Sequence, residues 1–203
     1  MPEFETYKTI KSESTALFKD KGSKHFGFSY RVNSVEQAKE KITALTNAHP
    51  KANHICFGYR IIDSEHVIEF CSDNGEPSNS AGAPILGQVK SFCVLNTLIC
   101  VVRYFGGTKL GVSGLINAYK TTAQLTLENS GITIYEPSYR VQLKLKTADF
   151  GKVLSYLSKE KMNIVNQGFT DKHEITVQTN TKDLNKIKAK FGSIHLLTWK
   201  KNS

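Results

Sequence analysis

The residues best suited to binding chemistry lie in two polar stretches of the first half of the chain, residues 72–82 and 103–114. In the second stretch an apolar run ends in Arg103, and Lys109 lies within the glycine-rich sequence that follows. Glycines let the backbone approach a ligand closely and turn its N–H groups outward, and the start of a helix adds partial positive charge. Two cations beside such amides suit an anion such as a phosphate. The pattern therefore predicts an anion site between a strand and a helix.

The expected ligand-binding residues come from both polar stretches and from a strand that precedes them. They are Arg103, Tyr104, Gly106, Gly107, Lys109, Gly111, Gly114, Asp73, Glu76, Ser78 and His54. The sequence leaves an alternative open, in which the glycines only permit a tight turn and the cations pair with Asp73 or Glu76. The glycine spacing excludes both a Walker A loop and the G-x-G-x-x-G dinucleotide fingerprint.

The same stretches contain residues that could take part in catalysis or hold a metal. Asp73 and Glu76 could form an acid/base pair or bind Mg²⁺. Because Asn74 lies between them and the loop offers only these two carboxylates, a structural pair is favoured. Ser78 lies in no G-x-S-x-G elbow, and hydroxyls in such loops usually bond to their own backbone. The sequence therefore predicts no catalytic residue, no metal and no cofactor.

Two longer motifs, DNGEPSNSAGAPIL and VVRYFGGTKLGVSGLINAY, closely resemble the YigZ/IMPACT family of uncharacterised and translation-associated proteins. The usual family pattern has two adjacent aspartates, then Gly-Glu-Pro-Ser, a small residue and Thr-Ala-Gly, and later Arg-Tyr-Phe-Gly-Gly-x-Lys-Leu-Gly. The chain departs from it at Asn74, in place of the second aspartate, and at Asn79-Ser80. The resemblance covers roughly residues 20–135 and identifies the chain as a member of this family.

The resemblance implies both a fold and a function. It implies an N-terminal domain like the second domain of a small-subunit ribosomal protein, and a C-terminal domain like the last domain of elongation factor G. The family's eukaryotic relatives are linked to control of the amino-acid-starvation response. They carry a separate N-terminal interaction domain that the sequence does not show, so a bacterial-type role is expected. Some members have carried peptidase-like labels.

The distribution of charge indicates two domains. The 203 residues carry a net charge of +9, but residues 1–136 hold 14 basic and 13 acidic side chains, and residues 137–203 hold 13 basic and only 5 acidic ones. We therefore expect a boundary at residue 136 and attraction of the second domain to polyanions. The side chains expected to steer a nucleic acid are Arg140, Lys144, Lys146, Lys186, Lys188 and Lys190.

Hydrophobic periodicity predicts an α+β fold. In the first domain we expect a βαβ-type arrangement, with strands at 26–32, 53–62, 66–71, 97–104 and 132–135, and helices from 35 to 49, after 83–84 and from about 114 to 130. Strand 97–104 is apolar on both faces and should be central. In the second domain the expected order is β-α-β-β-α-β, with a last strand at 194–199, which is that of the ferredoxin-like split βαβ unit.

Composition and cysteine spacing indicate the cellular compartment that we expect for the protein. No apolar run approaches the roughly 20 residues that span a bilayer, and the N-terminus lacks the apolar core of a signal peptide. The four cysteines form no C-x-x-C pair and are expected as buried free thiols of a cytoplasmic protein.

The leading functional hypothesis is a non-catalytic binding or regulatory protein near the translation machinery, whose partner is RNA or a ribosome-associated protein. Two alternatives stay open. One is an enzyme that acts on a small phosphorylated or peptide-like substrate between the two polar stretches, and the other is a protein-interaction module. The sequence leaves the oligomeric state open.

Overall fold

The chain folds into two compact units, Met1–Tyr135 and Glu136–Ser203. The computed structural model describes residues 6–63, 66–192 and 196–201. The division falls one residue before the boundary expected from the charge distribution. Each unit has its own hydrophobic core, so each is described by itself.

The first unit is built on a five-stranded antiparallel sheet of order β2-β3-β6-β4-β5, and β1 and β7 form a separate two-stranded sheet. Its elements are β1 (Tyr7–Ile10), β2 (Ser14–Asp20), β3 (Ser23–Arg31), α1 (Val35–Ala48), β4 (His54–Asp63), β5 (His66–Ser72), α2 (Gly82–Ser91), β6 (Thr97–Tyr104), α3 (Gly111–Ser130) and β7 (Ile132–Tyr135).

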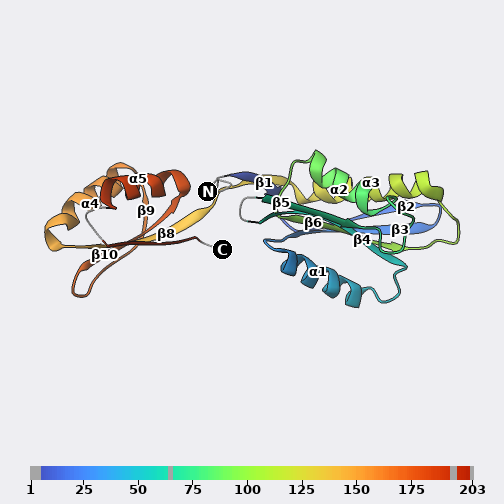
Figure 1. Ribbon diagram of the computed structural model, residues 1–203, viewed down its shortest axis with the longest axis horizontal. Helices are drawn as coiled ribbons and strands as arrows, with labels where there is room; N and C mark the ends of the chain where they lie inside the picture. The colour runs from blue at the N-terminus through green and yellow to red at the C-terminus, as the bar shows by residue number, and fades with distance from the viewer. Residues whose placement is uncertain (1–5, 64–65, 193–195, 202–203) are drawn as a thin grey trace. The chain divides into compact units, whose positions relative to one another are not determined.

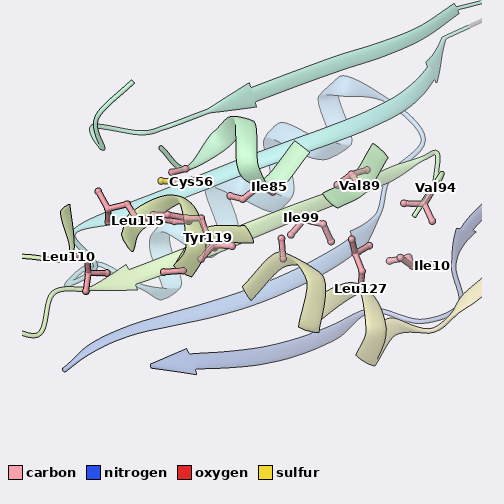
Figure 2. Packing of buried hydrophobic residues seen from close by; sticks show 14 residues of the cluster. Ile10, Cys56, Ile85, Val89, Val94, Ile99, Leu110, Leu115, Tyr119 and Leu127 are labelled. Atoms are coloured by element: carbon pink, nitrogen blue, oxygen red, sulfur yellow. The ribbon is translucent and has the colours of Figure 1, made fainter. Parts of the chain in front are cut away.

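Strand β6 occupies the centre of this sheet because both of its faces are apolar. Its alternate residues Ile99 and Val101 pack with α2 and α3, and Leu98, Cys100 and Val102 pack with α1 on the opposite face. Figure 1 shows α2 and α3 on one side of the sheet and α1 on the other. Figure 2 shows side chains of α2 and α3 gathered around Ile99. The sequence prediction of a central strand at 97–104 is confirmed.

The second unit has the ferredoxin-like arrangement that its sequence predicts. Its elements are β8 (Ser138–Leu145), α4 (Thr147–Lys159), β9 (Asn163–Phe169), β10 (His173–Asn180), α5 (Thr181–Phe191) and β11 (Leu196–Lys201). The strands form an antiparallel sheet of order β11-β8-β10-β9, and both helices pack on the same face (Figure 1). The expected α+β class is therefore confirmed for both units.

Several details differ from the sequence expectations. Strands β1 and β2 were not expected, and β7 pairs with β1 rather than joining the main sheet. Helix α3 begins at Gly111, three residues before the expected start, and that glycine has a positive φ of +74° at the junction between turn and helix. The last strand, β11, extends to Lys201, two residues beyond the expected end, and the first two residues of the expected strand, 194 and 195, lie outside the described residues. Cys93 is exposed in a turn after α2, whereas Cys56 and Cys100 are buried.

Candidate functional site

The polar loop between β5 and α2 is organised by Asp73. One oxygen of its carboxylate accepts the backbone N–H of Asn79 at 2.8 Å, and the other accepts those of Ala81 at 2.9 Å and Gly82 at 2.8 Å, where α2 begins. Burial by itself would raise the pKa of Asp73, but the three amides together outweigh it and lower the pKa. Both oxygens are therefore engaged in holding the loop, and the helix start is capped from a distance in sequence.

Glu76 joins this loop to the sheet and to α3. Its side chain is only 4% exposed, and its Oε1 accepts the Nη1–H of Arg103 at 2.5 Å and the hydroxyl of Tyr119 at 2.8 Å. Burial is the main cause that raises the pKa of Tyr119, so the hydroxyl stays protonated and donates. Arg103 is itself 7% exposed. The two polar stretches thus meet through a buried ion pair, which is the alternative that the sequence left open for Arg103.

The sheet register places two histidines beside this ion pair. His25 on β3 and His54 on β4 both lie opposite Arg103 on β6, so the three side chains project from the same face. The Nδ1–H of His54 donates to the carbonyl of Asn74 at 2.8 Å, and its Nε2 lies 4.0 Å from Oε1 of Glu76. When the imidazole is protonated, it forms an ion pair with that carboxylate.

His25 is fully buried at the other end of this row. Its ring stands edge-on to that of Tyr119 with centroids 5.2 Å apart, and neither of its nitrogens has a partner within the described part of the chain. Burial, and after it the positive charge of Arg103, lower the pKa of His25 to about 4. The imidazole is therefore neutral at physiological pH.

The glycines after β6 have different roles. Gly106 donates its N–H to Ser23 Oγ at 3.1 Å, and a Cβ added to it would lie 1.9 Å from the backbone of Gly22. Close packing of two backbones therefore requires glycine at 106. Gly107 and Gly111 have φ values of +90° and +74°, and a Cβ added to either would meet no atom within 4 Å. Glycine at these two positions permits the positive φ that the turn requires, and the space beside each Cα atom is open.

The expected anion ligands are consequently separated. Lys109 is exposed, and no carboxylate of the described residues pairs with it. Helix α3 starts after Leu110 without a side-chain cap and with no acidic residue in its first turn. Gly107, Lys109, Gly111 and the exposed Ser78 thus face solvent, while Arg103 and Glu76 are bonded to each other inside.

The two remaining expected site residues of the turn have local contacts. Tyr104 projects from the face of β6 that α1 covers, and its hydroxyl hydrogen-bonds with Nδ1 of His49 at 2.8 Å. Gly114 lies within the first turn of α3, where an added Cβ would be 3.0 Å from Cβ of Leu110. Among the described residues no group of three His, Cys, Asp or Glu side chains could hold a metal ion.

In the second unit the expected steering cations divide into paired and unpaired ones. Lys144 pairs with Glu174 at 2.9 Å, and Lys186 pairs with Glu160 at 2.9 Å. Two further lysines lie over aromatic rings: Lys188 over Trp199 and Lys190 over Tyr156. The exposed cations of the expected set that have no carboxylate partner in the described residues are Arg140, Lys146 and Lys190.

Sequence reasoning did not single out Tyr119 and His25 as members of the buried cluster. It also missed the exposed Asn53, whose Oδ1 accepts the N–H of Phe105 at 2.8 Å. For His25 the available signal was register: once β3 and β6 are neighbours, His25 lies opposite Arg103.

Comparison with known proteins agrees with the motifs. A family model described as the Impact N-terminal domain matches residues 21–127, more than half of the chain. The chain belongs to the IMPACT family. The family resemblance carried by the two motifs is therefore confirmed, and both motifs lie inside the matched range.

IMPACT relatives match the chain to different extents. IMPACT family member YvyE of Bacillus subtilis is 39% identical over 102 residues, which are 50% of this chain and 46% of the relative. YigZ of Escherichia coli is 38% identical over 43% of this chain and 44% of its own. These matches thus span less than half of either relative. An IMPACT family member of Haemophilus influenzae is 27% identical over 77% of this chain and 78% of the relative.

A solved structure shares the fold of the chain. The crystal structure of an hypothetical protein matches with a TM-score of 0.68 and 23% identity, over 95% of this chain and 96% of that one. The likeness at this identity shows the fold, with both units included. Within the described residues, no helix is long and apolar enough to cross a membrane.

Replacing Gly106 with alanine should destabilise this IMPACT protein by about 1–3 kcal/mol, because the new methyl group overlaps the backbone of Gly22. Gly87→Ala is the matched control: it lies in α2, meets no neighbour within 4 Å, and replaces glycine with a better helix former. Urea unfolding measures both variants. Equal midpoints would contradict the close approach of the two backbones.

Glu76→Gln should lower the free energy of unfolding by about 3–5 kcal/mol, since it leaves the guanidinium of Arg103 buried without its counter-charge. Glu69→Gln is the control, because Glu69 makes ion pairs with Arg60 and Lys90 at a partly exposed position. That change should cost less than about 1 kcal/mol. The same urea titration compares them, and a similar small loss in both variants would mean that the buried pair does not hold the loop.

The stability of the first unit should depend on the pH through His25. The unfolded histidine takes up a proton near its ordinary pKa of 6.5, whereas the folded one does so only at about 4. Stability is therefore fully present above pH 6.5 and is lost as the pH falls towards 4, at no more than about 1.4 kcal/mol per pH unit. His25→Phe, which keeps a ring against Tyr119, should flatten this slope.

The control for the pH dependence is His66→Gln, at an exposed position on β5. Chemical unfolding at several pH values between 4 and 7 gives the slope for each variant. A slope in His25→Phe equal to that of the wild type would show that the buried imidazole is not its source.

Proposed function

We propose that this IMPACT protein is a cytoplasmic, translation-associated regulatory protein that contacts RNA, and that the sheet of its second unit binds the phosphates. Support comes first from family membership, since the chain shares the Impact N-terminal domain with relatives in bacteria and in the yeasts. Family membership alone names no ligand, so the ligand class is inferred from charge.

The observation that carries the proposal is a pair of adjacent cations on the open face of the second sheet. Arg140 alternates with the buried Tyr139 and Val141, so it projects away from α4 and α5. Lys200 on β11 lies directly opposite it. Like charges opposite each other destabilise a sheet, and a row of phosphates would relieve that cost.

The surroundings of this pair strengthen the case. The next strand places neutral Gln178 opposite Arg140, and no carboxylate of the described residues pairs with either cation. The other end of the same face differs, because Lys144 there is neutralised by Glu174. The unpaired end of the face is thus the part suited to a polyanion, in a unit whose sequence holds 13 basic and 5 acidic side chains.

Catalysis by the buried cluster receives no comparable support. The Oε1 atom of Glu76 already accepts two hydrogen bonds, and both oxygens of Asp73 are bonded to backbone amides. These carboxylates organise the loop. We therefore keep a binding function as the conclusion.

The double variant Arg140→Ser/Lys200→Ser should bind RNA less tightly and with a weaker salt dependence. The slope of log K against log salt concentration should become shallower by about 1–2, because two phosphate contacts are lost. This slope is measured by fluorescence anisotropy with a labelled 12-nucleotide RNA at salt concentrations between 50 and 300 mM, where the RNA length and the salt range are choices of the assay.

The matched control removes two charges from the first unit, at the exposed helix positions Lys39 and Lys120. Lys39→Ser/Lys120→Ser should leave the slope unchanged. An equal effect of the two double variants would show that only net charge matters. Absence of salt-dependent RNA binding by the wild type would overturn the proposed function.

A further inference from the structure

The surface of the first unit has a depression of about 490 Å³ beside the glycine turn. It is lined by Gly22, Lys24, Phe26, His49, Tyr104 and Phe105. Its volume lies within the range of about 300–1,000 Å³ that is usual for small-molecule pockets. The depression lies at the end of the sheet where α1 stops, because α1 ends at Ala48.

Aromatic rings line this depression, and two of them, Tyr104 and Phe26, are held by contacts with each other or with His49. Tyr104 packs edge-on against Phe26 with centroids 5.9 Å apart, and its hydroxyl is bonded to His49. The backbone of Phe105 is fixed by Asn53, yet its side chain is 46% exposed. A large exposed aromatic side chain beside other rings provides a flat apolar surface, and contact of that surface with water is unfavourable.

Positive charge surrounds the same rings. Lys24 lines the depression, and Lys21, Lys51 and Lys109 are exposed within a few residues of its lining. Among the described residues no carboxylate pairs with any of these four lysines. Asp20 is the acidic residue next to Lys21 in the sequence. It lies opposite Ser23, and its charge acts to raise the pKa of His25 at the other face of the sheet.

We propose that this depression stacks an unpaired base of single-stranded RNA against Phe105 and its neighbouring rings, with Lys24 beside the adjoining phosphate. The inference rests on the proposed function, because it names the part of the RNA that the first unit reads. Every base has a face that can stack on an aromatic ring, so such a site tolerates any sequence. A duplex hides its bases and leaves the depression empty.

Charge decides against an apolar protein segment as the occupant. Such a segment would cover Lys24 and the neighbouring ammonium groups without neutralising them, at a desolvation cost. A nucleotide strand satisfies both features, since its phosphates meet the lysines and its bases meet the rings. The lysines and aromatic rings of the depression thus match the alternating phosphates and bases of a single strand.

The test measures anisotropy of a labelled 12-nucleotide single strand and of the same strand in a duplex, with the full chain. Phe105→Leu should weaken binding of the single strand about tenfold and leave both the salt slope and duplex binding unchanged. Phe105→Trp should keep the affinity of the wild type, because it keeps a ring. Phe70→Leu is the matched control, since Phe70 is 50% exposed on β5 but does not line the depression.

The outcomes separate this inference from the function on which it rests. Salt-dependent binding that Phe105→Leu does not weaken, or that Phe70→Leu weakens equally, overturns base stacking and leaves the proposed function standing. No binding of either RNA by the wild type overturns the proposed function itself. Displacement of the strand by micromolar AMP would assign the depression to a free nucleotide and overturn the strand as occupant.

Discussion

The buried ion pair between Glu76 and Arg103 is the constraint on which the first unit depends. A charged pair taken out of water loses its hydration, and only good geometry with further hydrogen bonds offsets that loss. Here the hydroxyl of Tyr119 supplies a second donor to the same oxygen of Glu76. The pair therefore fixes three elements at once: the loop before α2, the central strand β6 and helix α3.

The ion pair also divides the segment after β6 from the buried residues that hold the fold together. Arg103 faces inward, and the next residue, Tyr104, faces the opposite side of the sheet because strand residues alternate. Gly106 then brings the chain against the β2–β3 turn, and the backbone emerges at Gly107. Residues 103–107 thus supply a buried ion-pair residue on one face of the sheet, an aromatic side chain on the other face, and a solvent-exposed turn.

Much of the fold follows from local pattern, whereas the roles of the site residues do not. The apolar run at 97–104 predicts a buried central strand, and the alternation at 139–145 predicts one covered face, because burial imposes these periods directly. Strand β2 has the weaker burial of an edge strand and gave no such signal. Whether Arg103 binds a ligand or Glu76 depends on a contact between residues 27 positions apart, and neither residue's own neighbours encode that distance.

Pairing therefore decides which of the many cations can act on a partner. Formal charge counts Arg103, Lys144 and Lys186 equally with Arg140, but the first three each have a carboxylate within 3 Å. A cation that is already paired must lose one contact to make another, so its net gain on binding is small. Among the described residues, two groups of cations without a carboxylate partner lie beside the proposed RNA sites: Arg140 and Lys200 on the open sheet face of the second unit, and Lys24 with its neighbours around the aromatic depression of the first. The surfaces proposed to bind RNA are thus defined less by where lysine and arginine occur than by where the described residues hold no carboxylate partner for them.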